Sequence, residues 1–416
     1  MTSYARETEL PSGLRVITLD MPRAQSVALG LFADVGSRDE AAVMHGASHA
    51  LEHMVFKGAG PWDVHALSER LDALGGNANA FTSRERTCFH MQVLHESWAE
   101  ALELLAAMVC SPHLPEEEWE KEREVIYSEM AMVEDAPEEW VMDQHVSALF
   151  PDHALGRSIL GTRSSLATLH AEDLRRHLED NYGGSRLLLA AAGNIRHESL
   201  VDAASAIHWR SASARTARTA PSPSSGVQTL SREGEQAHLL VSWPCIHAAA
   251  EERPLAWLAN QMLGGGMSSH LFREVREKRG LAYSIASHLN LLSDVGTWGI
   301  SCSCSPEHGR RCIDVLREVL QAFPQRLNER DLRRAKSQLR VQLRMGMDSV
   351  EGQMLYLGSR LDDPMLRSPV AWTQAVDRVE LDELIGWVRL QLCKPTLWTV
   401  AASEEQLPAM QQALQA

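Results

Sequence analysis

The sequence has little positive charge and no long hydrophobic run. Its 40 lysine and arginine residues are outnumbered by 55 acidic residues, which gives a net charge of −15. Nucleic acids and anionic membrane surfaces favour basic proteins, so we expect no nucleic-acid partner and no membrane partner. A membrane-spanning helix needs ~18–20 consecutive apolar residues. The apolar stretch Leu187–Ile195 has the length of a strand instead.

The first twenty residues also lack the features of a targeting segment. They contain neither an apolar core before a small-residue cleavage site nor an arginine-rich, acid-free amphipathic pattern. The seven cysteines are odd in number and irregularly spaced, which suits reduced thiols. We expect Cys302 and Cys304 to point to opposite faces of a strand, which argues against a shared metal or disulfide. These observations together predict a cytoplasmic protein.

A chain of 416 residues is too long for one ordinary hydrophobic core and fits two domains. Near its middle, "SASARTARTAPSPSSG" (211–226) is rich in Ser, Ala, Thr and Pro and has almost no large apolar residue. Such a composition is typical of a linker. We therefore predict an N-terminal domain over 1–210, a linker over 211–230 and a C-terminal domain over 231–416.

The two predicted domains follow the same order of patterns. Each begins with strand-like segments and continues with a helical stretch, a Gly-rich turn, more strand and long amphipathic helices. "LPEEEWEKEREVIYSEM" from Leu114 aligns with "LNERDLRRAKSQLRVQL" from Leu327. The sequence therefore predicts an α+β fold of two tandem homologous domains, each a mixed β-sheet covered by helices.

The stretch "HGASHALEHMVFKG" (45–58) concentrates titratable side chains on one predicted helix. His49 and His53 are four residues apart, so their imidazoles lie on one face, one turn apart, as in many zinc sites. Glu52 precedes the second histidine, which gives the H-x-x-E-H order of the inverzincin zinc peptidases. A solvated, His-rich helix remains the alternative on this pattern alone.

A catalytic zinc site needs a third protein ligand from another element. The helical stretch "EEEWEKEREVIYSEMAMVED" places Glu122 and Glu129 seven residues apart, two turns along one face. Its other acids are expected to be solvated: Glu117, Glu118, Glu120 and Glu124.

The second half of the chain offers an internal comparison. Its residues aligned with His49, Glu52 and His53 are Trp257, Asn260 and Gln261, and the residue aligned with Glu129 is Gln342. The second half therefore lacks every titratable group of the first-half motif. We infer that only the first half forms a chemically active site.

The combination of His49-Ala50-Leu51-Glu52-His53 with Glu129, 76 positions after the second histidine, resembles the pitrilysin/insulinase-type zinc peptidases. Their mitochondrial processing peptidase branch has this spacing. The flanking segments "MVFKG", "GGNANAFTSRERT" and "LGRSILGT" are similar as well. The resemblance extends over essentially the whole chain.

This resemblance implies a role for each matching residue. His49, His53 and Glu129 would hold Zn²⁺. Glu52 would be the general base for a zinc-activated water, and Glu122 would orient a ligand. His45 has no place in the pattern, so we expect a helix-start or surface histidine, with a supporting role beside the metal ligands left open.

Further residues match positions that bind substrate in the family. Asn79 and Ala80, in "NANAFTS", correspond to a strand that binds extended peptide through its main chain. A plain strand after a Gly-Gly turn is the alternative. In "FREVREKRGLAYSI", Arg276 would bind the peptide backbone, and the hydroxyl of Tyr283 would stabilise the oxyanion.

The resemblance thus implies a zinc metalloendopeptidase that hydrolyses short, unfolded peptides. One subunit of a heterodimeric processing peptidase and a non-catalytic scaffold subunit are the alternatives. The intact metal motif argues against a scaffold, and the presence of Arg276 and Tyr283 in the same chain argues against divided sites. Larger family members enclose their peptide in a four-domain clam-like chamber. Two domains form half of such a chamber, so we expect a homodimer, with a heterodimer as the alternative.

Overall fold

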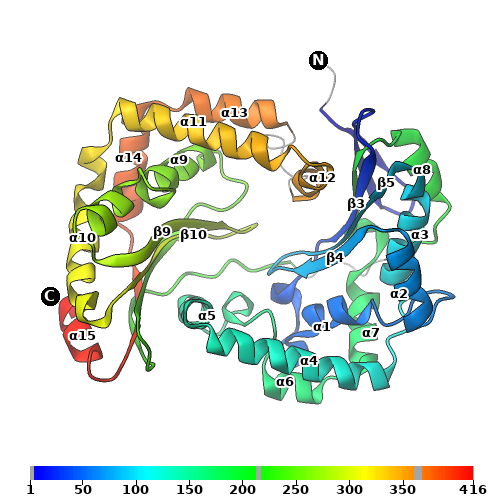
Figure 1. Cartoon of the computed structure of the whole chain (residues 1–416), viewed down its shortest axis with the longest axis horizontal. Coiled ribbons are helices and arrows are strands. Elements are labelled where there is room, and N and C mark those ends of the chain that lie inside the picture. The colour runs from blue at the N-terminus through cyan, green and yellow to red at the C-terminus, as the bar shows by residue number, and fades with distance from the viewer. Residues whose placement is uncertain (1–3, 212–216, 360–367, 416) are drawn as a thin grey trace. The chain divides into compact units, whose positions relative to one another are not determined.

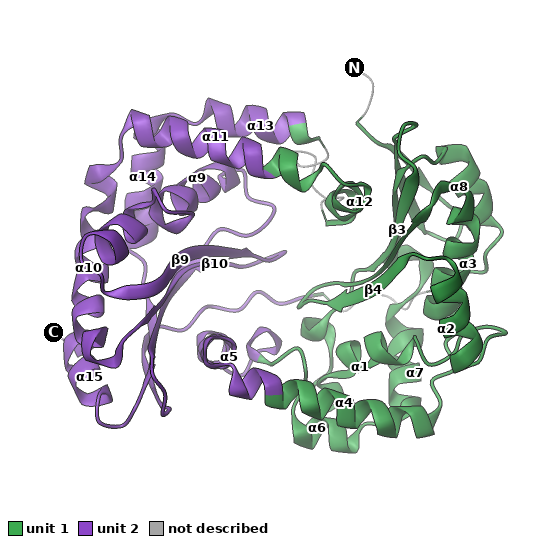
Figure 2. Cartoon of the chain, viewed as in Figure 1, with its two compact units in different colours: residues 1–131, 157–217, 343–369 green, residues 132–156, 218–342, 370–416 purple. Residues whose placement is uncertain are grey.

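The computed structural model describes residues 4–211, 217–359 and 368–415 (Figure 1). Their contacts divide them into two compact units, coloured separately in Figure 2. Unit 1 consists of residues 1–131, 157–217 and 343–369, and unit 2 of residues 132–156, 218–342 and 370–416. Among the described residues, no helix is both long and apolar enough to cross a membrane.

The strands of unit 1 are β1 (Arg6–Glu9), β2 (Arg15–Asp20), β3 (Ser26–Ala33), β4 (Asn77–Thr82), β5 (Thr87–Leu94) and β6 (Leu187–Gly193). Its helices are α1 (Ala47–Met54), α2 (Val64–Ala73), α3 (Trp98–Cys110), α6 (Arg163–Thr168), α7 (Ala171–Asn181), α8 (His197–Ser205), α12 (Val350–Ser359) and most of α4 (Glu116–Asp135).

The strands of unit 2 are β7 (Gly226–Ser231), β8 (Ala237–Cys245), β9 (Ala282–Leu291), β10 (Gly296–Cys304) and β11 (Leu397–Ala402). Its helices are α5 (Pro137–Leu149), α9 (Arg253–Gly264), α10 (Gly309–Arg326), α13 (Pro369–Arg378), α14 (Leu381–Leu392), α15 (Leu407–Gln415) and most of α11 (Glu329–Gly346).

The central strands β3 and β6 of the unit 1 sheet are buried on both faces, as their almost continuous apolar sequences require. The order of this sheet is β1-β2-β6-β3-β5-β4, so β4 is an edge strand. Alternate residues of β3 enter two different cores. Leu29 and Leu31 join the larger core with α1, α3 and α7, whereas Ala28 and Phe32 join a smaller core with α12. In Figure 1, α12 lies on one side of these strands and α3 and α8 lie on the other.

Two glycines allow α12 to pack closely on this sheet. A Cβ at Gly30 of β3 would lie 2.4 Å from Sδ of Met354, and one at Gly358 would lie 2.1 Å from the ring of Phe32. Neither position therefore has room for a side chain.

The sheet of unit 2 repeats the topology of the first. Its order is β7-β11-β8-β10-β9, and the strands β2-β6-β3-β5-β4 follow the same order in unit 1. In both sheets the first of these pairs is parallel and the others are antiparallel. The predicted pair of homologous mixed sheets with helices is confirmed.

Each unit nevertheless includes a helix from the other half of the sequence. Helix α12 packs on the first sheet, and α5 packs on β8 and β11 of the second through Val141, Leu240 and Ala401. The sequence-based domains 1–210 and 231–416 follow the repeat along the chain, whereas the compact units combine segments of both halves. Within the predicted linker 211–230, residues 212–216 lie outside the described residues, and the residues from Gly226 belong to β7.

The expectation that Cys302 and Cys304 point to opposite faces is wrong. Two residues span one full period of a strand, so both side chains of β10 point the same way. Both thiols are buried and hydrogen bond with Cys312 of α10. All three thiols are free.

Candidate metal centre

Helix α1, which carries the H-x-x-E-H motif, is held at its N-terminus by a buried carboxylate. Gly46 precedes the helix with a left-handed φ of 96°, which favours glycine. Glu40 accepts hydrogen bonds from the backbone amides of Gly46 at 2.8 Å and Ser48 at 2.7 Å. These amides have no partner within the helix, so Glu40 satisfies them and fixes where α1 begins. Burial raises the pKa of Glu40 to about 7.

His45 directly precedes this helix start, which agrees with the first of the two places expected for it, and its side chain is buried. Its Nε2 lies 2.8 Å from the carbonyl oxygen of Ser158, in the segment "LGRSILGT" (155–162) that is similar to the family. His45 therefore connects this segment to the beginning of α1.

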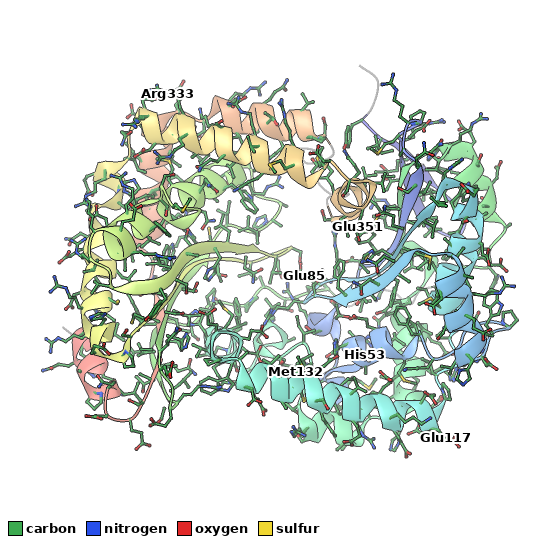
Figure 3. The ribbon with its side chains drawn as sticks, viewed as in Figure 1. His53, Glu85, Glu117, Met132, Arg333 and Glu351 are labelled. Carbon is green, nitrogen blue, oxygen red and sulfur yellow. The ribbon has the colours of Figure 1, made fainter. Side chains whose placement is uncertain are left out.

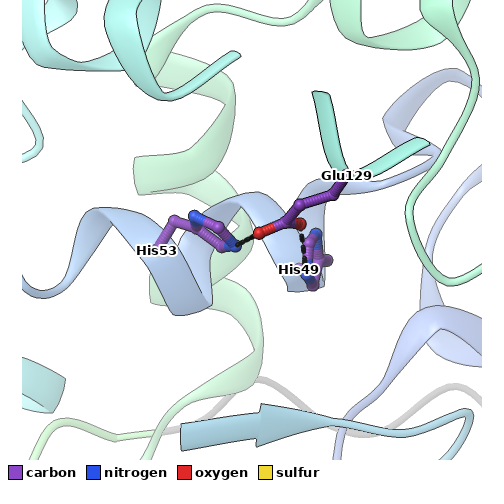
Figure 4. Close-up of side chains that lie close together, drawn as sticks. All are labelled: His49, His53 and Glu129. Carbon is purple, nitrogen blue, oxygen red and sulfur yellow. Dashed lines mark ion pairs between the residues drawn. The ribbon is translucent and has the colours of Figure 1, made fainter. Parts of the chain in front are cut away.

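Two histidines of α1 and one glutamate of α4 converge at a single point (Figure 4). Nε2 of His49 lies 3.6 Å from Oε2 of Glu129, and Nε2 of His53 lies 3.6 Å from Oε1 of the same carboxylate. Candidate ligand atoms of the three side chains lie within 4.8 Å of one another, the one such group among the described residues. The structure thus brings the predicted ligands together.

This geometry fits a zinc ion. Tetrahedral zinc with bonds of about 2.1 Å separates two ligand atoms by about 3.4 Å, close to the 3.6 Å observed. The same distance is too long for a direct hydrogen bond. Burial, and then the neighbouring His53, lower the pKa of His49 to about 4, so its imidazole is neutral at neutral pH. A neutral imidazole is the form that binds a metal.

Glu122 lies behind the second histidine instead of among the converging atoms. Its Oε2 is 3.1 Å from Nδ1 of His53, and its Oε1 is 2.5 Å from Nζ of Lys57. A hydrogen bond from Nδ1 to this carboxylate leaves the lone pair on Nε2, which is the atom that faces Glu129. This arrangement agrees with the orienting role expected for Glu122.

Glu52 interacts electrostatically with His53 and Glu129 and also contacts β4. Its Oε2 accepts a 2.5 Å hydrogen bond from the hydroxyl of Thr82. Burial raises the pKa of Glu52, and the hydrogen bond from Thr82 opposes that rise. A partly buried carboxylate with a raised pKa, beside a metal site, suits a general base.

Strand β4 presents an unpaired edge beside α1. The amide of Ser83 bonds to the carbonyl of Arg86 in the β4–β5 hairpin, so by alternation the main-chain groups of Ala80 and Thr82 face away from β5. Asn79 lies on the same strand, and its Oδ1 accepts a 2.9 Å hydrogen bond from the Ala80 amide. The candidate substrate contacts therefore lie on an exposed sheet edge.

The predicted Arg276 and Tyr283 belong to unit 2. Arg276 is exposed in a π-helical turn, η6 (Phe272–Glu277), with its guanidinium 5.0 Å from the centroid of the Phe272 ring. Such turns are rare and occur often at functional sites. Tyr283 is 64% exposed on β9, the edge strand of the second sheet.

The turn between these two residues is held by Glu274. Its carboxylate contacts Nζ of Lys278 at 2.7 Å and the guanidinium of Arg279 at 3.0 Å. These partners, Lys278 first, lower the pKa of Glu274 to about 2. Glu274 thereby fixes the segment that leads from Arg276 to Tyr283.

The remaining acids of α4 are largely solvated, as expected. Glu117, Glu120 and Glu124 are exposed, and Glu118 pairs with the exposed Lys121. Figure 3 labels Glu117 near the start of the helix, away from His53.

The residues of unit 2 that align with the metal motif make ordinary hydrogen bonds. Oδ1 of Asn260 accepts from the indole of Trp298, and the amide of Gln261 donates to Gln338. These contacts explain how the repeat keeps its packing without metal ligands.

Reasoning from the sequence missed three residues: Glu40, Lys57 and Thr82. Lys57 and Thr82 lie inside segments already noted for the family resemblance, and only their side-chain contacts distinguish them. Glu40 precedes the motif by several residues, and no local pattern marks it as a helix cap.

The fold and the site define a class of metal-dependent hydrolase with two homologous domains. The chain matches the insulinase family, peptidase family M16, over residues 15–163, and the peptidase M16 inactive domain over residues 168–339. It is 35% identical over 364 residues to a protein of Streptomyces coelicolor named as an uncharacterized zinc protease, covering 85% of this chain and 79% of that protein. A protein of the same description from Bacillus subtilis is 33% identical over 345 residues, covering 82% and 84%.

Solved structures show the same fold at lower sequence identity. A peptidase M16 inactive domain from Pseudomonas fluorescens superposes with a TM-score of 0.88 and 18% identity, covering 96% of this chain and 98% of its own. A protease from Helicobacter pylori superposes with a TM-score of 0.87 and 17% identity, covering 96% and 99%. The chain belongs to peptidase family M16, and the predicted class, a peptidase with zinc, agrees with the names of its relatives.

Proposed function

We propose that this protein is a zinc metalloendopeptidase that hydrolyses short, unfolded peptides. The observation that carries the proposal is the convergence of His49, His53 and Glu129, with the Glu52 carboxylate on the same helix. Three protein ligands leave a fourth position open, which is the arrangement of catalytic rather than structural zinc.

Each side chain then has one task. His49, His53 and Glu129 hold the metal, and Glu122 keeps the ring of His53 in its binding orientation. Zinc, when bound, supplies Lewis-acid chemistry by polarising the scissile carbonyl and lowering the pKa of the attacking water. Glu52 accepts the proton from that water and later delivers it to the leaving amine.

Strand β4 provides the surface for substrate. An extended peptide adds to the exposed edge through main-chain hydrogen bonds, which select an unfolded conformation without selecting particular side chains. Asn79 and Ala80 lie on this edge. Following the family resemblance, we assign Arg276 to the peptide backbone and the hydroxyl of Tyr283 to the oxyanion; both side chains are exposed.

We place the activity in the cytoplasm and in a homodimer. The seven cysteines are all free, which supports a reducing compartment. The homodimer is carried over from the family resemblance, because the two described domains correspond to half of a four-domain peptide chamber.

A digest of a random peptide library tests this function. Mass spectrometry should detect internal cleavage by the purified protein, loss of cleavage after chelation, and recovery when zinc is added back. Cleavage that persists unchanged in excess chelator, or no cleavage by the zinc-loaded protein, would refute the proposal.

A further inference from the structure

Two glutamates of α4 reach the metal helix with the same functional group but with different surroundings. Glu129 faces both imidazoles at 3.6 Å. Both oxygens of Glu122 are engaged instead, one by His53 and one by Lys57. The partner that distinguishes the two carboxylates is therefore Lys57.

We propose that Lys57 is a positioning residue that holds Glu122 behind His53 and keeps it out of the coordination of the metal. The proposal rests on the zinc site described above. Lys57 lies outside the metal motif. It affects the metal only through Glu122 and His53.

The position of Lys57 is fixed by the end of α1. Its backbone amide bonds to the carbonyl of Met54 at 3.0 Å, in the turn that follows the helix. The side chains of Lys57 and His53 both contact the Glu122 carboxylate. The side chains of Lys57 and Glu122 are 24% and 12% exposed, so water competes weakly for this 2.5 Å contact.

The ion pair restricts Glu122 in a way that one hydrogen bond does not. A carboxylate held only by His53 can rotate about its terminal bond and turn a free oxygen toward the metal. With Oε1 occupied by the ammonium group, the remaining oxygen stays directed at Nδ1 of His53. Partners behind metal-binding histidines commonly contribute 10–100-fold to metal affinity by fixing ring orientation.

The Lys57→Met variant tests this role through metal binding. We expect zinc affinity, measured by competition with a chelating dye, to fall about tenfold, because Glu122 no longer holds the ring of His53. We also expect the visible spectrum of the cobalt-substituted variant to change, because Glu122 becomes free to enter the coordination sphere. Lys121→Met is the matched control. It removes a 68% exposed lysine that pairs with Glu118, and both readouts should remain native.

A double-mutant cycle separates this role from a general effect on structure. In a Glu122→Gln background, Lys57→Met should cause no further loss of zinc affinity, since its partner is already gone. Lys57→Arg, which retains the charge, should bind zinc within about threefold of the native protein. If Lys57→Met does not fold, Lys57→Gln serves in its place.

Two results would overturn the proposal: a native zinc affinity and cobalt spectrum for Lys57→Met, or an equal loss of affinity in both backgrounds. Failure of the zinc site itself would look different. In that case the native protein would bind no zinc, or His49→Ala would bind it normally.

Discussion

The hydroxyl of Thr82 donates a 2.5 Å hydrogen bond to Oε2 of Glu52, which joins the exposed edge strand β4 to the metal helix α1. The candidate base is therefore oriented by the same strand that we assign to substrate binding. A peptide added to β4 lies beside the carboxylate that must accept a proton from the attacking water.

Replacement of Thr82 by valine should slow hydrolysis without loss of zinc. Valine retains the β-branched shape but donates no hydrogen bond, so kcat should fall by about 10- to 150-fold, the equivalent of the ~1.5–3 kcal/mol of a hydrogen bond to a charged group. The Thr82 hydrogen bond lowers the pKa of Glu52. Its loss should move the acid limb of the pH–rate profile to higher pH. An unshifted acid limb in Thr82→Val would contradict this role.

Arg276 and Tyr283 should affect catalysis and not metal content. Tyr283→Phe removes only a hydroxyl from a 64% exposed ring, so the fold should be unaffected. We expect kcat to fall by about 10²–10³, as for loss of an oxyanion donor. Arg276→Ala should mainly raise KM, because its task is substrate binding. Steady-state kinetics on zinc-saturated variants measure both effects. Native kcat in Tyr283→Phe would remove the hydroxyl from the mechanism.

The site could be predicted from the sequence where its geometry is local. His49 and His53 share a helix face by spacing alone, and so the metal hypothesis needed no tertiary structure. Glu129 required the family resemblance, because no local rule brings residue 129 to residue 53. Lys57 and Thr82 could not be found at all, since their roles depend on side-chain contacts between separate elements.

The fold, too, could be predicted from the sequence only in part. The repeat predicted two equivalent sheets, because each half carries its own strand and helix pattern. The packing of α12 on the first sheet and α5 on the second was not predicted. An apolar helix face indicates that a helix covers a sheet, but it does not indicate which of two similar sheets is covered.

Glu40 should make stability depend on pH. Burial raises its pKa from 4.5 to about 7, so the folded protein binds this proton more tightly than the unfolded chain. Between these pH values the folded state holds more protons, and its stability therefore decreases as pH rises. Relative to Glu40→Gln, the metal-free native protein should lose up to roughly 3 kcal/mol of unfolding free energy from about pH 5 to about pH 8.

Urea denaturation of both proteins across this pH range measures the difference. Glu124→Gln, at an exposed position of α4, is the control and should show no such trend. A stability difference between native protein and Glu40→Gln that stays constant with pH would contradict the assignment of a titrating, buried helix cap.

Assembly should limit the size of the substrate. We expect a closed twofold homodimer, the commonest symmetric assembly, which sediments near twice 46.2 kDa. Such a dimer should cut flexible peptides and spare folded proteins.

Mixing Glu52→Gln with an Arg276→Ala/Tyr283→Phe variant tests which chain supplies Arg276 and Tyr283. Recovered activity means that the two residues act across chains, and no recovery means that they act within one chain. A monomer that digests native globular proteins as readily as peptides would contradict the enclosed chamber.

The central claim is that His49, His53 and Glu129 hold zinc while Glu52 performs the proton transfer. Its most direct test is to measure zinc content and peptide hydrolysis on the same preparations of native protein, Glu52→Gln and Glu129→Gln. We predict about one zinc per chain in the native protein. Glu52→Gln should retain its zinc with activity nearly abolished, and Glu129→Gln should lose most of both. Full zinc occupancy in Glu129→Gln, or near-native hydrolysis by Glu52→Gln, would contradict the account.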